Sequence, residues 1–251
     1  MMELDRYTKV GIQRELHLEW FDQAARLYGM GFSKTDARQE IYTYLDGAPG
    51  FDASPSKQTK VYIANTLVKS WLAPERDLIP IRNTAFQLLQ KNPNARLPIH
   101  WSLLGAAYPF WFSVAAIIGR LLNLQNQATQ LQVVSRLKEK YGDRQTVTRR
   151  ARYVIRSFVA WGALKDVDTK GCYGKPSPMV ISDENLAVLM FESALRAIPE
   201  GKGVLGQLLN NPVFFPFQLP AMTGGFISQR NERIDVIRYG LDDELLKLKV
   251  D

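Results

Sequence analysis

The chain has 251 residues, of which 46% are apolar and 23% are charged. These are ordinary values for a globular protein, so they exclude extensive disorder. A single cysteine excludes an internal disulfide framework and fits a reducing compartment. The N-terminal residues lack the apolar stretch of a secretory signal peptide, so we expect a cytoplasmic protein. The net charge of +7 favours an anionic partner.

Residues 1–95 are predicted to form a helical domain. Apolar residues at helical spacing predict helices over residues 13–28, 34–45, 55–72 and 80–91. Ser33 and Asp36 form a variant of the capping box, and Ser54 followed by Pro55 is typical of an N-cap and a first helical residue. The third helix carries lysines on its polar side. It is therefore either a second DNA contact or, more simply, part of a helical hairpin.

Residues 101–119 contain no charged side chain, and their length approaches that of a membrane span. Pro109 interrupts the stretch and leaves two pieces that are too short to cross a bilayer. The mean hydropathy of the chain is −0.18. We therefore predict two core helices, over residues 100–108 and 110–122, and no membrane contact. A domain boundary is predicted in the preceding Pro- and Asn-rich stretch, so that a second domain covers residues 98–182.

The positive charge of the chain is concentrated between residues 129 and 175. This stretch holds eleven Lys or Arg and four Asp or Glu, a net charge of +7 that equals the charge of the whole chain. Such a concentration is typical of a nucleic-acid-binding surface. The simpler alternative is a solvated basic helix that binds nothing.

Two helices are predicted in this basic stretch, over residues 129–141 and 144–161. Thr129 is a suitable N-cap for the first helix, and Leu131 is expected on its buried side. The second helix ends before Gly162 and has one apolar stripe, formed by Val147, Ala151, Val154, Phe158 and Trp161. Residues 163–167 and 179–181 are predicted to pair as a hairpin. Two helices and a hairpin in this order predict a winged helix-turn-helix.

The candidate DNA contacts follow from this arrangement. The second helix would lie in the major groove with Arg149, Arg152 and Arg156, while the first helix would cross the backbone. The complete set of candidate DNA-binding residues is Arg136, Lys138, Lys140, Arg144, Gln145, Thr146, Thr148, Arg149, Arg152, Arg156, Lys170 and Lys175. The expected partner is double-stranded DNA, since the basic–aromatic pattern of single-strand RNA readers is missing.

No residue pattern predicts catalysis, a cofactor or a metal site. His17 and His100 have no Cys, His or paired carboxylate at metal-ligand spacing, and Cys172 has no histidine nearby in the sequence. Residues 201–203 read Gly-Lys-Gly, but the complete phosphate-loop pattern is absent. We therefore expect a protein that is not an enzyme.

The layout resembles the BrxA family of BREX phage-defence systems. The resemblance covers residues 31–167: a capped basic helix reading SKQTKVYIANTLVKSWL, an apolar helix pair, and a winged helix ending in FVAWGAL. It implies a non-enzymatic DNA-binding component of a bacterial defence system, with other defence proteins as further partners. A broader resemblance, to the winged-helix superfamily, covers residues 110–181.

Two other functions remain open at this point. A transcription regulator of its own operon would bind a palindromic site as a dimer. A protein–protein adaptor would use the aromatic residues 213–217 as an exposed anchor. Residues 183–251 are predicted to be a small mixed extension, with a helix over residues 183–197, a short helix over 204–209, strands 225–227 and 233–239, and a terminal helix over 242–248. The predicted fold class is thus mainly α.

Overall fold

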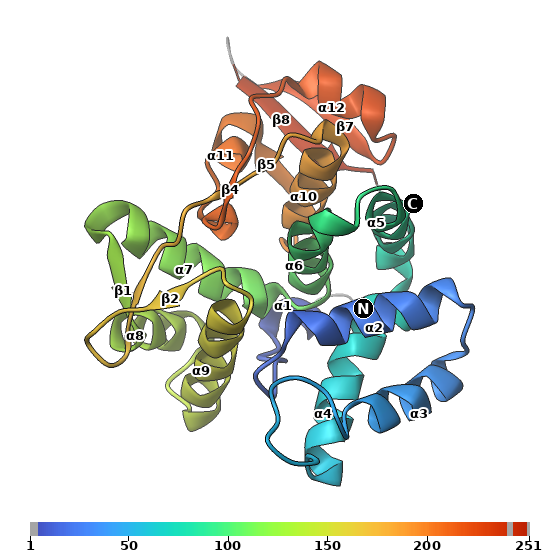
Figure 1. Ribbon diagram of the computed structural model, residues 1–251. Coiled ribbons are helices and arrows are strands. Elements are labelled where there is room, and N and C mark those ends of the chain that lie inside the picture. The colour runs from blue at the N-terminus through green and yellow to red at the C-terminus, as the bar shows by residue number, and fades with distance from the viewer. Residues whose placement is uncertain (1–4, 240–242, 250–251) are drawn as a thin grey trace.

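The computed structural model describes residues 5–239 and 243–249, and it is mainly helical. Figure 1 shows three groups of elements: the blue-to-cyan N-terminal helices, a green-to-olive group with a hairpin, and an orange-to-red C-terminal group. Their buried apolar side chains form one continuous cluster that extends from Ile12 to Leu246. The division into three domains at residues 95–98 and 182–183 stays a prediction.

The N-terminal group contains short helical turns between its longer helices. Its elements are α1 (Asp5–Thr8), α2 (Leu18–Gly29), α3 (Lys34–Tyr44), α4 (Lys57–Leu67), the π-helical turn η1 (Val68–Leu72), η2 (Arg76–Leu78) and α5 (Ile79–Lys91). Ser33 caps α3 as predicted, since its hydroxyl accepts a hydrogen bond from the Asp36 amide at 3.2 Å. The prediction of Ser54 as the N-cap of α4 is wrong. Ser56 caps this helix, and the Ser54 hydroxyl instead donates to Asp46.

The middle group begins with the apolar helix pair. Its elements are η3 (Pro93–Ala95), α6 (Arg96–Ala107), α7 (Pro109–Gln125), β1 (Gln127–Thr129), α8 (Gln130–Tyr141), α9 (Gln145–Ala160), β2 (Lys165–Asp166) and β3 (Cys172–Gly174). The predicted break at Pro109 is confirmed, because the chain bends there by 117°. Within the described residues, no single helix has both the length and the apolar composition to cross a membrane, although this bent pair has them together.

A three-stranded antiparallel sheet covers one end of α8 and α9. Strand β3 is central, and Tyr173 pairs with Ala128 of β1 and with Asp166 of β2. The predicted pairing of residues 163–167 with 179–181 is wrong. Gly171, at φ +78°, allows a tight turn in which the Cys172 amide donates to Thr169 O, so the chain returns at β3. Residues 179–180 form another strand elsewhere.

The C-terminal group is the mixed α/β part. Its elements are β4 (Met179–Val180), α10 (Glu184–Arg196), β5 (Lys202–Val204), α11 (Leu205–Leu209), η4 (Pro212–Phe214), β6 (Phe217–Gln218), α12 (Gly224–Arg230), β7 (Ile234–Tyr239) and β8 (Asp243–Leu248). Strand β4 runs parallel to β6, and β8 lies between β5 and β7 in an antiparallel sheet.

Two predictions for this group are wrong. Residues 225–227 lie in helix α12, whose N-cap Thr223 accepts a hydrogen bond from the Phe226 amide. Residues 243–248 form a strand and not a helix, because Leu246 is buried between Val236 and Gly203 of the neighbouring strands. Position 242, where the terminal helix was predicted to begin, lies outside the described residues.

The C-terminal half of α9 is buried where the three groups meet. The Phe158 ring lies 4.6 Å from both Trp101 and Trp111. The Leu16 amide donates to Ser157 Oγ at 2.8 Å, and the Trp161 indole donates to Leu16 O at 3.0 Å. These two bonds keep residue 16 out of a helix, which explains why α2 begins at residue 18 and not at 13.

The aromatic residues 213–217 are part of this core. Trp101 Nε1 donates to Val213 O at 3.1 Å, and the rings of Phe215 and Phe217 lie within 6 Å of Trp101. All the apolar residues of the segment are buried. The expectation of an exposed aromatic anchor at this position is therefore wrong.

Candidate nucleic-acid interface

Helix α9 separates an apolar face from a cationic face. Val147, Ala151 and Val154 have no exposed surface, whereas Arg149 and Arg152 are exposed. Among the residues that the structure describes, no carboxylate forms a salt bridge with either arginine. The helix is thus anchored on one side and presents free positive charge on the other.

The first turn of α9 projects into solvent. Gly142, at φ +87°, ends α8, and Arg144 is the N-cap of α9 without a side-chain capping bond. The Arg144 guanidinium instead donates to Tyr141 O at 2.8 Å. Gln145 and Thr146 are exposed and Thr148 is partly exposed. The positive end of the helix dipole is therefore open to an anion.

Arg156 differs from the other two arginines of the stripe. Its Nη1 lies 2.9 Å from both carboxylate oxygens of Asp166 in strand β2. This ion pair raises the pKa of Arg156 above its ordinary value. The charge is partly neutralised within the protein, so Arg156 also ties the helix to the hairpin.

Two basic residues of α8, Arg136 and Lys140, lie toward α7, whereas Lys138 does not. Lys138 pairs with Asp143 at 2.7 Å, and Lys140 donates to Ser113 Oγ at 3.1 Å. Arg136 is exposed and lines a shallow hollow of about 400 Å³ together with Arg120. Arg120 lies on α7, outside the basic stretch, and no sequence pattern indicates it as a DNA contact.

The buried side of α8 was predicted incorrectly in one position. Leu131 is 80% exposed, whereas the buried residues are Val133, Val134, Leu137 and Tyr141. Thr129 is the N-cap as predicted, and it forms a reciprocal capping box with Gln132. Because this cap fixes the first turn, Leu131 points outward beside the hairpin.

The two lysines of the predicted hairpin are placed differently. Lys170 is exposed in the turn between β2 and β3, and Lys175 is partly exposed just after β3. Lys170, Cys172 and Leu131 line a hollow of about 600 Å³ between the hairpin and the start of α8. Together with the exposed Lys165 of β2, the hairpin therefore carries one cation at its tip and two at its base.

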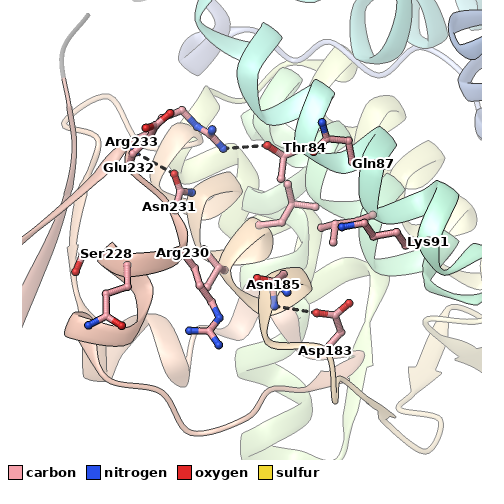
Figure 2. A pocket seen from close by; sticks show the side chains of 14 residues that line it. Thr84, Gln87, Lys91, Asp183, Asn185, Ser228, Arg230, Asn231, Glu232 and Arg233 are labelled. Atoms are coloured by element: carbon pink, nitrogen blue, oxygen red, sulfur yellow. Dashed lines mark hydrogen bonds between the residues drawn. The ribbon is translucent and has the colours of Figure 1, made fainter.

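A polar hollow of about 440 Å³ lies between α5, α10 and α12. Figure 2 shows Arg233 reaching Thr84 across this hollow, and Asp183 bonded to Asn185. Its arginines are already paired: Arg233 with Glu192 at 2.6 Å, and Arg230 with Glu184 at 3.3 Å. These contacts join the elements around the hollow.

The histidine in the core also has a structural position. Trp71 Nε1 donates to His100 Nδ1 at 3.1 Å, and His100 Nε2 lies 2.9 Å from Asp22 Oδ1. Burial lowers the pKa of His100 below its ordinary value, although Asp22 opposes this shift. Since the indole can only donate, His100 is neutral with its proton on Nε2. Within the described residues, no three His, Cys, Asp or Glu side chains gather as metal ligands.

Comparisons with known proteins give no further guidance. No protein-family model matches the chain, and neither do curated proteins or solved structures. The resemblance to BrxA proteins stays a prediction. The function must be inferred from the geometry of the chain itself.

Proposed function

We propose that α7, α8, α9 and the β1–β3–β2 sheet form a winged helix that binds double-stranded DNA and catalyses no reaction. The order helix, strand, two helices and hairpin supports this fold, and the sheet closes one end of the helices as a wing does (Figure 1). We further propose that the protein acts in the cytoplasm of a bacterium, as a component of a phage-defence system that includes other defence proteins. This context depends on the resemblance of the sequence alone.

One observation carries the proposal: Arg149 and Arg152 are exposed on a helix whose opposite face is fully buried, and neither forms a salt bridge with a described carboxylate. Leaving charge unpaired in this way favours a polyanion as partner. Helix α9 would enter the major groove, with Gln145, Thr146 and Thr148 near bases or phosphates. The phosphate contacts would come from Arg136, Lys138, Lys140, Arg144, Arg156, Lys170 and Lys175.

A titration of a labelled random duplex by fluorescence anisotropy tests this proposal. We expect salt-sensitive binding by the unaltered protein, and a loss of about tenfold or more for each of Arg149→Ala and Arg152→Ala. Lys202→Ala, in the distant strand β5, is the matched control and should bind as the unaltered protein does. The proposal is wrong if the unaltered protein does not bind the duplex at low salt.

A further inference from the structure

A second group of cations lies where α9 meets α4 and the extended segment before α2. We call the residues Arg14, Tyr62, Arg150 and Tyr153 the seam. The Arg14 guanidinium lies 4.8 Å from the centre of the Tyr62 ring and 5.9 Å from that of Tyr153. Its Nε donates to Thr59 Oγ1 at 3.3 Å. Arg14 is thus held between a ring of α4 and a ring of α9.

The seam concentrates positive charge without an anion. In the described part of the chain, neither Arg14 nor Arg150 forms a salt bridge with a carboxylate. Arg150 Nε is excluded from solvent and has no hydrogen-bond partner there. Burial lowers the pKa of Arg150, and the neighbouring charges of Arg149 and Arg14 lower it further. Tyr153 and Tyr62 oppose this shift, but within the described residues no carboxylate balances the two guanidinium groups of the seam.

A purely structural role accounts for only part of this arrangement. Stacking on Tyr62 and Tyr153 explains the position of Arg14. It does not explain a second arginine beside it, because packing alone would be served better by a neutral side chain. A guanidinium group is well suited to a phosphate, whose oxygens accept two parallel hydrogen bonds from it, and the Arg150 Nε is without a partner in the described part of the chain.

We propose that the seam is a phosphate-binding site for the backbone of the same DNA that α9 binds. This inference rests on the proposed function and adds Arg14 and Arg150, which lie outside the predicted interface. Helix α4 takes part by positioning Arg14, through the Thr59 hydroxyl and the Tyr62 ring. Its Lys60 is paired with Asp46.

Salt dependence distinguishes a phosphate contact from a packing role. We would titrate a labelled duplex of random sequence with Arg14→Gln and Arg150→Gln at several salt concentrations. Each variant should bind several-fold more weakly. The slope of log affinity against log salt should become less steep by about 1, as expected for one lost phosphate contact. Arg14→Lys keeps the charge and should retain more of the slope. If Arg14→Gln does not fold, Arg150→Gln carries the test. Arg76→Gln, an exposed arginine of η2, is the matched control and should change neither quantity.

The outcomes separate this inference from the proposed function. If Arg149→Ala weakens duplex binding while both seam variants keep the affinity and slope of the unaltered protein, the seam inference alone is overturned. If the unaltered protein does not bind the duplex, both are overturned. If the seam variants lose binding to poly-glutamate but not to duplex, the seam serves an acidic protein, and this too contradicts the inference.

Discussion

The arginines of α9 and those around Glu192 show how differently one side chain is used within this molecule. Glu192 has no exposed surface and accepts hydrogen bonds from Arg196 at 2.8 Å, Arg233 at 2.6 Å and Asn231 at 2.7 Å. On α9, Arg149 and Arg152 face solvent and form no salt bridge with a described carboxylate. The state of pairing, and not the number of arginines, therefore identifies the candidate interface.

This difference has a physical basis. A buried carboxylate is tolerated only when donors replace its lost hydration, and the donors around Glu192 hold its pKa below the ordinary value despite burial. The exposed arginines remain hydrated and can exchange water for phosphate. One cluster thus stabilises the fold, while the other is available for binding.

We expect the greatest loss of stability from a substitution in the buried cluster around Glu192. Glu192→Gln removes the buried negative charge that Arg196 and Arg233 share, and we expect a loss of about 3–5 kcal/mol in the free energy of unfolding. Urea denaturation measures this loss. Glu184→Gln, at the exposed pair with Arg230, is the control and should cost less than about 1 kcal/mol. Equal losses in the two variants would contradict the conclusion that the buried carboxylate of Glu192 stabilises the fold.

A second prediction concerns the neutral histidine beside Asp22. The pKa of His100 is below its ordinary value of 6.5 in the folded protein, so the unfolded chain binds more protons as the pH falls below 6.5. The contribution of His100 to the free energy of unfolding should be constant above that pH. Below it, this contribution should decrease by at most about 1.4 kcal/mol per pH unit. Urea unfolding at pH 7, 6 and 5 measures the slope. His100→Gln should lack this contribution, and an unchanged slope in that variant would refute the prediction.

The last prediction concerns the difference between the paired Arg156 and the two unpaired arginines of α9, and its expected effect is small. Asp166→Asn releases Arg156 from its ion pair, so we expect duplex affinity to rise by a few-fold at low salt. Because the pair is partly exposed, unfolding should change by less than about 1 kcal/mol. Anisotropy titration checks the affinity, with Asp168→Asn as the control for loss of a neighbouring negative charge. Equal gains in both variants would indicate a general charge effect rather than release of Arg156.

Much of the candidate interface was predictable from local sequence signals. The helices around residues 130–141 and 145–160, the Thr129 cap and the stop at Gly162 all depend on residues close together in the chain. In the structure, the Gly162 amide donates to Val159 O and the Ala163 amide to Phe158 O, which completes the expected helix end. The pairing of Arg156 with Asp166 was not predictable, because nothing in the sequence distinguishes this arginine from Arg149 or Arg152.

The mainly helical class, the break at Pro109 and the concentration of charge between residues 129 and 175 follow directly from the order of the residues. Periodicity, capping and net charge are local or additive properties, so they can be read without a fold. The strand partners of Tyr173, the burial of residues 213–217 and the position of Arg14 between Tyr62 and Tyr153 become evident only in the folded chain. Short strands and isolated side chains carry no local signal for a distant partner, and their contacts exist only once the shared core has formed.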